Sequence, residues 1–190
     1  MILKTIFLAF VLFLLSGSLL AQRAQMGFRL ETLGMHRTHS NAFNSDTKKE
    51  LFYIPVPSAL QLNVSVFPVK DLSLDARLGG VFAWLGFSGF EYGLYSKYYL
   101  WDRYYISGGI VMHHNDGHKG IFSGMGEKYS MPAFGAGMKL TKVTNADLMF
   151  YYAGNKLLTD NYSFGTPPTT FTRFDWLLKL SLDFEWEVFF

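Results

Sequence analysis

In this 190-residue sequence, the histidines are the side chains whose chemistry and spacing could bind a metal ion or support catalysis. His114, Asp116 and His118 alternate within the segment HHNDGH, so they would share one face of an extended chain. Two imidazoles and a carboxylate are ligands that zinc or copper accepts. The same segment also suits a solvated polar loop that turns at Gly117, and short matches of this kind arise by chance. The loop is the stronger interpretation, and we expect no cofactor and no metal.

The N-terminal segment, 1–21, has the layout of a secretory signal peptide. Lys4 precedes an apolar run that continues through Leu15, and small residues follow. This run is short for a membrane-spanning helix, which needs about 20 apolar residues. We expect cleavage after Ala21 and a single domain over residues 22–190.

The composition excludes several classes of protein. The chain has no cysteine, so disulfides cannot stabilise it after export. Its 17 basic and 15 acidic residues nearly balance and form no basic run, which excludes a nucleic-acid-binding surface. Beyond the signal peptide, no apolar stretch is long enough for a helical membrane span.

Apolar and polar residues alternate along most of the remaining chain, which predicts β-strands rather than helices. The alternation marks eight segments, at 26–33, 58–67, 72–82, 90–100, 104–113, 133–140, 146–152 and 173–190.

In every segment the charged residues fall on one face only. That face carries Arg29, Glu31, Asp75, Arg77, Glu91, Lys97, Lys139, Asp147, Lys179, Asp183, Glu185 and Glu187. A soluble β-sandwich or a lipocalin-like barrel would also alternate. These strands, however, approach the 9–11 residues of a tilted membrane strand, and aromatic residues gather near their ends.

The connections between the strands alternate in length. The links near 68–71, 101–103 and 141–145 are short, whereas those at 34–57, 113–131 and 153–172 are long, and the link at 83–89 is intermediate. Transmembrane barrels have this asymmetry, with short periplasmic turns and longer outside loops. We therefore predict an all-β, transmembrane, antiparallel up-and-down barrel with both termini in the periplasm.

This pattern resembles the small eight-stranded outer-membrane barrels of Gram-negative bacteria, such as OmpX, OmpW and the membrane domain of OmpA. The resemblance is sharpest in the last strand, where Phe184, Trp186, Val188 and Phe190 alternate up to the final residue. In that class such a strand is the signal read by the barrel-assembly machinery. The resemblance implies a location in the bacterial outer membrane. It also implies contact with outer-membrane lipid and lipopolysaccharide, and an extracellular ligand at the loops.

We expect the charges to fill the barrel interior as an ion-pair network, since a barrel of eight strands is only wide enough for its own side chains. A turn centred on Val143 would place Lys139 opposite Asp147. A loop centred on Gly86 would place Asp75 opposite Lys97.

Three functions remain open from the sequence. The first is a structural or surface-interaction protein, and the second is a narrow conduit or binding site for small apolar molecules, as in the OmpW type. The third is an enzyme that modifies lipid A. The deacylase type of such enzymes uses a His-x-Ser pair with a carboxylate, whereas His36, Thr38 and Ser40 give His-x-Thr. We expect that the protein is not an enzyme.

Overall fold

The computed structural model describes residues 23–41, 47–83, 87–115, 122–123, 128–161 and 170–188. Eight strands form the wall: β1 (Arg23–Asn41), β2 (Thr47–Val69), β3 (Leu72–Phe82), β4 (Ser88–Leu100), β5 (Tyr104–Asn115), β7 (Lys128–Lys139), β8 (Thr144–Asn161) and β9 (Thr170–Val188). A further strand of two residues, β6 (Phe122–Ser123), pairs with the end of β8. The predicted signal peptide, 1–21, lies outside the described residues.

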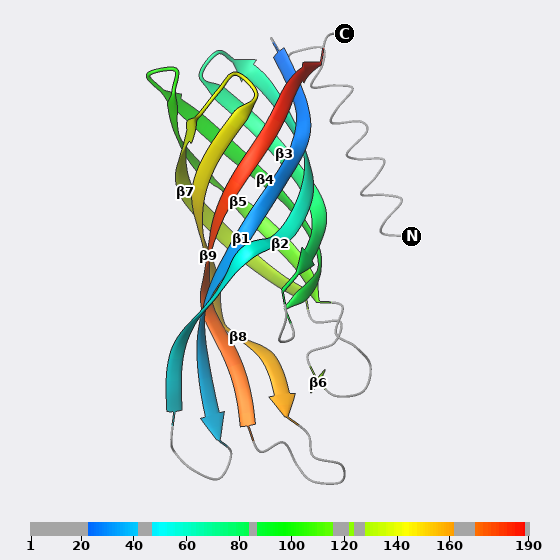
Figure 1. Cartoon of the computed structure of the whole chain (residues 1–190), viewed down its shortest axis with the longest axis vertical. Helices are drawn as coiled ribbons and strands as arrows, with labels where there is room; N and C mark the ends of the chain where they lie inside the picture. The colour runs from blue at the N-terminus through cyan, green and yellow to red at the C-terminus, as the bar shows by residue number, and fades with distance from the viewer. Residues whose placement is uncertain are drawn as a thin grey trace.

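The strands form one antiparallel sheet that closes on itself. Their order is β6-β8-β7-β5-β4-β3-β2-β1-β9, and β8 also pairs with β9 to complete the ring (Figure 1). The prediction of an eight-stranded, up-and-down barrel is confirmed. Closure pairs the backbone groups around the wall, which is what a lipid environment demands. No helix among these residues is long and apolar enough to cross a membrane.

The two ends of the barrel differ. At one end, here called the terminal end, lie Arg23 and Val188 together with the short links 70–71, 101–103 and 140–143. At the opposite end, the loop end, β1 is joined to β2, β3 to β4, β5 to β7 and β8 to β9. This arrangement follows from antiparallel pairing of consecutive strands.

Four strands continue beyond the others at the loop end (Figure 1). Pairs run as far as Ser40 with Thr47, Asn41 with Thr170, and Asn161 with Thr170. The extensions 47–57, 33–41, 170–176 and 152–161 thus form a projecting sheet in the order β2-β1-β9-β8. The prediction that 34–57 and 153–172 are long loops was wrong, because hydrogen bonding continues between these neighbouring strands past the end of β3.

Two prolines misled the prediction at β2. Pro55 and Pro57 lie in the part of β2 that has no β3 partner, since the pairing with β3 begins at Ala59. A proline at a sheet edge removes no ladder hydrogen bond. The strand therefore continues through both prolines, with a register shift opposite Glu31 and Leu33.

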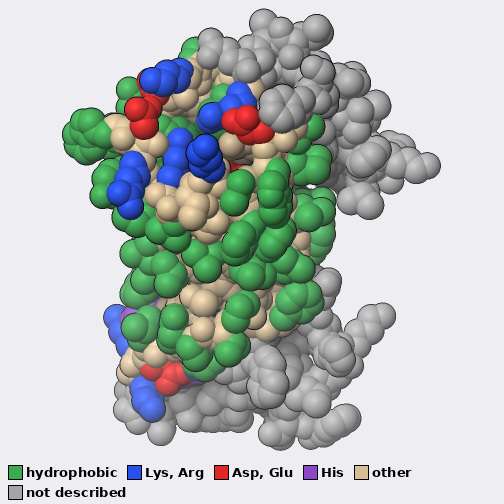
Figure 2. Space-filling model, turned by 45° about the horizontal axis from the view of Figure 1, so that its top comes forward, with side chains coloured by type: hydrophobic (Ala, Val, Ile, Leu, Met, Phe, Trp, Pro, Cys, Tyr) green, Lys and Arg blue, Asp and Glu red, His purple; other side chains and the backbone are tan. Residues whose placement is uncertain are grey.

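The wall separates an apolar outside from a polar inside. On β2, Leu60 and Leu62 are 49% and 65% exposed, whereas Gln61 and Asn63 are 3% and 1% exposed. Figure 2 shows a broad hydrophobic band across the visible face of the barrel, with charged side chains gathered toward its ends. A soluble barrel or sandwich buries its apolar face, so this arrangement is that of a membrane barrel.

Side chains fill the interior in three layers. Toward the loop end lies an apolar cluster that includes Met35, Phe87, Tyr129, Met131 and Phe174. The charged layer lies in the middle, and Phe67, Tyr99 and Tyr105 pack toward the terminal end. Gly137 makes room for the last of these, because a Cβ at this position would lie 2.4 Å from the Tyr105 ring.

Candidate functional site

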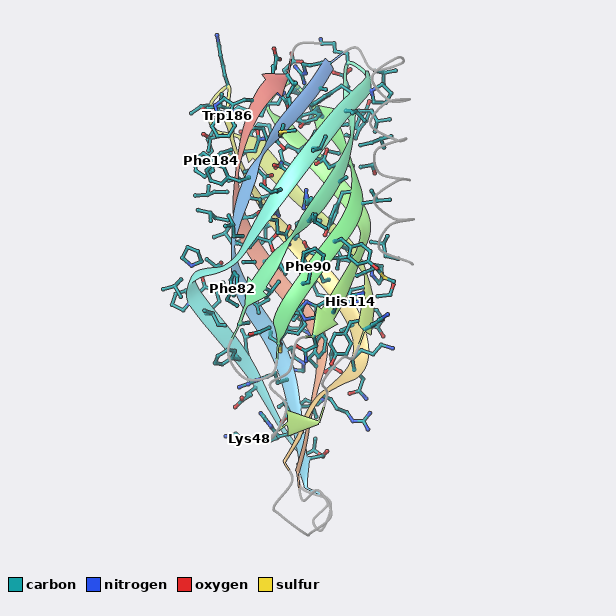
Figure 3. The ribbon with its side chains drawn as sticks, turned by 90° about the vertical axis from the view of Figure 1, so that its right-hand side faces the viewer. Lys48, Phe82, Phe90, His114, Phe184 and Trp186 are labelled. Atoms are coloured by element: carbon teal, nitrogen blue, oxygen red, sulfur yellow. The ribbon has the colours of Figure 1, made fainter. Side chains whose placement is uncertain are left out.

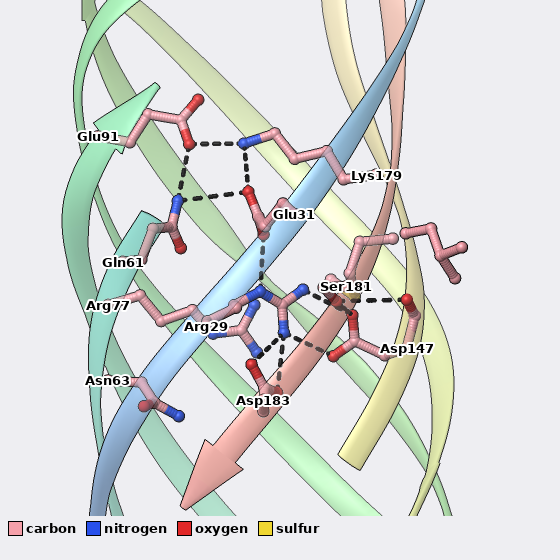
Figure 4. Close-up of polar contacts among 12 residues, drawn as sticks. Arg29, Glu31, Gln61, Asn63, Arg77, Glu91, Asp147, Lys179, Ser181 and Asp183 are labelled. Carbon is pink, nitrogen blue, oxygen red and sulfur yellow. Dashed lines mark hydrogen bonds and ion pairs between the residues drawn. The ribbon is translucent and has the colours of Figure 1, made fainter. Parts of the chain in front are cut away.

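Arg29 of β1 is the centre of the charged layer (Figure 4). Its Nε donates to Glu31 Oε1 at 2.6 Å, and its Nη2 donates to Asp147 Oδ1 at 2.6 Å. Its Nη1 lies 2.9 Å from Asp183 Oδ2. The carboxylates come from β1, β8 and β9, so closure of the barrel between β9 and β1 brings them together. Bonds between charged groups are strong in such a buried setting, and losing one partner is costly.

Lys179 of β9 extends the network toward the loop end. Its Nζ lies 2.9 Å from Glu31 Oε2 and 2.6 Å from Glu91 Oε2. Glu91 also contacts His113, with 3.1 Å between Oε1 and Nδ1. The His113 ring stacks on Phe87 at 4.0 Å between centroids, so this histidine joins the charged layer to the apolar cluster.

Lys97 of β4 extends the network toward the terminal end. Its Nζ lies 2.8 Å from Asp75 Oδ2 and 3.4 Å from Glu185 Oε1. The predicted opposition of Asp75 and Lys97 around Gly86 was wrong, because Asp75 is opposite Tyr95. The two side chains nevertheless meet, since a diagonal neighbour on a sheet is within reach of a lysine.

Arg77 of β3 has the least complete set of partners. Its Nη2 lies 3.6 Å from Asp75 Oδ2, and its guanidinium carbon lies 3.9 Å from the centroid of the Tyr95 ring. None of its three side-chain nitrogens forms a hydrogen bond with the described residues. Figure 4 shows Arg77 beside Arg29, so the acidic groups of this layer must balance two neighbouring guanidinium groups.

The charged layer is acidic overall and closed. It holds four basic side chains, Arg29, Arg77, Lys97 and Lys179, and six acidic ones, Glu31, Asp75, Glu91, Asp147, Asp183 and Glu185. Arg29, Glu91 and Lys97 have 0% exposure, so no water-sized space adjoins them. Ion pairs therefore block the middle of the barrel.

Lys139 does not belong to this layer, contrary to the prediction. It is opposite Asn145 rather than Asp147, because the turn between β7 and β8 is shifted from a centre at Val143. Its Nζ lies 4.2 Å from the centroid of the Tyr99 ring. Among the described residues, no carboxylate lies within ion-pair distance of this lysine.

Glu187 also lies outside the charged layer. It is near the terminal end of β9, and its side chain is 44% exposed. Its Oε1 lies 3.6 Å from Arg23 Nη1, which makes a solvent-exposed pair. Such a pair contributes little to stability.

The prediction omitted several uncharged members of the network. Gln61 Nε2 donates to Glu91 Oε2 at 2.9 Å, and Asn63 Nδ2 donates to Glu185 Oε1 at 2.5 Å. The hydroxyl of Ser181 donates to Asp147. The alternation of the sequence could have identified them, because Gln61 and Asn63 lie on the polar face of their strand. His113 could have been found in the same way, from its spacing after Val111.

Two of the proposed assembly residues, Phe184 and Trp186, lie on the outside of β9 near the terminal end (Figure 3). The ring of Phe28 stacks on Phe184 at 4.9 Å and lies 5.8 Å from Trp186. Val188 ends the strand, and Phe190 lies outside the described residues. Their role in assembly stays a prediction.

Two of the residues considered for catalysis, His36 and Thr38, contact the carboxylate of Asp175. His36 Nδ1 lies 2.9 Å from Asp175 Oδ2, and the Thr38 hydroxyl donates to the same oxygen at 3.5 Å. Nucleophilic catalysis requires a hydroxyl bound to the imidazole and the imidazole bound to the carboxylate. Here the hydroxyl bonds to the carboxylate instead, so the arrangement does not activate it.

The metal candidates are only partly described. Asp116 and His118 lie outside the described residues. His114 lies on the outside of β5, where its Nε2 is 3.5 Å from the hydroxyl of Tyr92. Within the ranges that the structure describes, no three His, Asp or Glu side chains are placed to hold a metal ion.

Known proteins resemble this chain only in fold. No family model and no curated protein matches it. Similar solved structures include the N-terminal β-barrel domain of Pseudomonas aeruginosa OprF (15% identity, 87% of this chain and 99% of that chain, TM-score 0.45). They also include the outer membrane protein OprG from Pseudomonas aeruginosa (10% identity, 87% of this chain and 97% of that chain, TM-score 0.43). A third is the attachment invasion locus protein Ail of Yersinia pestis (10% identity, 87% of this chain and 100% of that chain, TM-score 0.43). Likenesses this distant carry no information on function.

The geometry itself defines the class of protein. A closed antiparallel wall, an apolar outer surface and a charged, filled interior occur together in small transmembrane β-barrels. The chain folds as an eight-stranded barrel of the outer-membrane type.

Proposed function

We propose that this protein is an integral outer-membrane barrel of Gram-negative bacteria with a structural or surface-interaction role. Its termini lie in the periplasm and its projecting sheet lies outside the cell. The observation that supports this proposal is that ion pairs occupy the barrel from wall to wall, and their side chains have almost no accessible surface. A barrel built in this way serves as a membrane anchor for the sheet that it holds.

A conduit for small apolar molecules fits the interior less well. Phe87, Met131 and Phe174 have 0% exposure in the apolar cluster at the loop end, so a ligand would have to displace them. Beyond them it would meet the charged layer, where an apolar molecule gains nothing. The conduit would therefore need two rearrangements of tightly packed groups.

The projecting sheet suits a surface role. Its strands are hydrogen-bonded to one another, so it presents side chains at fixed positions. A preorganised surface loses less conformational entropy on binding than a flexible loop does. Outer-membrane lipid, lipopolysaccharide and the barrel-assembly machinery are the other partners that we propose.

Conductance in planar bilayers tests this function. The refolded mature protein should show no steady ion current and should not accelerate the entry of small solutes into liposomes. A wide-porin control reconstituted in the same way should conduct. Steady current through this protein would overturn the anchor role and favour the conduit.

A comparison of cells with and without the protein separates the remaining alternatives. Lipid A mass spectra should be the same in both, whereas a change in acyl chains would establish an enzyme instead. Cells that carry the full chain should bind to a glycan and matrix-protein array more than cells whose barrel lacks residues 38–49. Equal binding would overturn the surface-interaction role.

A further inference from the structure

The outward face of the projecting sheet is built in rows across its strands. Directly paired residues of an antiparallel sheet share a face and lie about 5 Å apart. Leu51 of β2, His36 of β1, Trp176 of β9 and Tyr152 of β8 form one such row. The row nearer the barrel contains Tyr53, Gly34, Leu178 and Phe150. These two rows continue the apolar belt and end it with aromatic rings, which is the composition of a membrane interface.

The next row outward is basic. Thr38 of β1 is paired with Lys49 of β2 on one side and with Arg173 of β9 on the other. Both cations are exposed, and neither forms an ion pair within the described part of the chain. Successive rows on one face are about 7 Å apart, and the backbones of Lys49 and Arg173 are about 10 Å apart. Two long basic side chains at that spacing can converge on one phosphate group above the aromatic row.

The polar groups near the two cations are held in place. The His36 ring is parallel to that of Trp176, at 5.3 Å between centroids and 8° between planes. Its Nδ1 and the Thr38 hydroxyl both contact Asp175, which is the one carboxylate that these two groups contact in the described part of the chain. Asp175 is therefore already engaged, and the row as a whole keeps an excess of positive charge.

The opposite side of the barrel also places a histidine beside aromatic and basic residues. His114 of β5 is paired with Phe90 of β4 and with Lys128 of β7 (Figure 3). Toward the middle of the wall, Met112 is paired with Tyr92. Here the histidine lies directly between an aromatic ring and an exposed lysine, whereas at the first site the cations occupy the row beyond His36.

We propose that the row Lys49–Thr38–Arg173 binds the phosphorylated headgroup of an outer-leaflet glycolipid of the lipid A type. This inference rests on the proposed placement of the loop end in the outer leaflet. Acyl chains would lie along the aliphatic face below, sugars would lie against Trp176 and Tyr152, and phosphate would reach the two cations. A free phosphate would use only the cations, whereas the lipid also uses the rows beneath them.

Native mass spectrometry of the full mature barrel in phosphatidylcholine nanodiscs tests the site. The nanodiscs contain added bisphosphorylated lipid A, or lipid A from which the phosphates have been removed. The test variant combines Lys49→Gln and Arg173→Gln. The matched control combines Arg103→Gln and Lys142→Gln, which removes two exposed cations from the short turns at the terminal end.

We expect the test variant to bind phosphorylated lipid A roughly 30-fold more weakly, since each cation near a membrane surface is worth about fivefold in binding. The control variant should bind like the unmodified protein. Neither variant should differ from the unmodified protein in binding dephosphorylated lipid A. A Lys49→Arg variant, which keeps both positive charges, should retain most of the binding to phosphorylated lipid A. Equal losses in the test and control variants, or no loss in either, would overturn the site.

This outcome is separable from that of the proposed function. Lipid binding in nanodiscs does not depend on which way the barrel is inserted in a cell. A reversed topology in cells would overturn the proposed function and leave the binding result standing. Loss of phosphate selectivity would overturn the site alone. Gel migration before and after heating confirms that each variant is folded.

Discussion

Arg29 and Asp147 are separated by 118 positions in the sequence, yet 2.6 Å separates Arg29 Nη2 from Asp147 Oδ1. Both side chains have 0% exposure. The contact crosses the seam at which the last strand of the barrel meets the first. Glu31 lies on the same strand as Arg29, whereas Asp147 and Asp183 reach this arginine only when β8, β9 and β1 are adjacent. Closure of the wall therefore completes the set of partners of the central arginine.

Replacing Arg29 should destabilise the barrel strongly. Arg29→Met removes the partner of Glu31, Asp147 and Asp183 and leaves buried carboxylates uncompensated, which costs about 3–5 kcal/mol. Urea unfolding of the refolded barrel in vesicles measures the loss. Arg23→Met is the control, since its pair with Glu187 is exposed and should cost under about 1 kcal/mol. Similar losses in both variants would contradict the central role of Arg29.

Deleting Phe190 should reduce assembly without preventing export. The resemblance to small outer-membrane barrels implies that the C-terminal strand is read by the assembly machinery, and Phe190 is its last residue. We expect less heat-modifiable, folded protein in the outer membrane at unchanged total expression. Replacing the neighbouring Phe189 by alanine is the control. Normal levels of the folded form after the deletion would argue against an assembly signal.

A protease site placed after Asn161 should be cut on intact cells, because the loop end faces outward in the proposed topology. A site placed at Lys142 should be cut only after the outer membrane is opened. Lys142 is exposed in the turn between β7 and β8, so an insertion there spares the interior. Asn145 would be a poor choice, because its Nδ2 donates to Glu185 at 2.8 Å. The opposite pattern of cleavage would reverse the orientation.

The projecting sheet should loosen as the solution becomes acidic. A hydrogen bond from His39, assisted by Arg37, holds the pKa of Glu50 below its ordinary value of 4.5. A carboxyl whose pKa is lower in the folded state stabilises that state above the unfolded pKa, and this stabilisation disappears as the pH falls through the folded pKa. Amide NMR signals of residues 36–51 should therefore weaken between about pH 5 and about pH 3.

Glu50→Gln is the matched variant for this pH dependence. It keeps the size of the side chain and removes its titration, so the same signals should lose most of their dependence on pH. If the variant and the unmodified protein respond identically to acid, Glu50 is not the responsible group.

The strand pattern of the sequence was enough to predict the barrel, for a physical reason. Side chains alternate along a strand, so a segment such as Gln61 and Asn63 between Leu60, Leu62 and Val64 already states which residues face lipid. The same parity sorted the charges to the inside. A barrel this narrow leaves no other place for them.

The partners of the charges could not be read from the sequence. Pairing depends on register, and a shift in either turn moves every opposite residue, as with Lys139, which is opposite Asn145. It also depends on which strands meet when the sheet closes, and that contact brings Arg29 to Asp147 and Asp183. The extent of the projecting sheet was likewise decided by pairing between strands, because the polar and proline-containing sequence of 34–57 reads as a loop until a neighbouring strand supplies its hydrogen bonds.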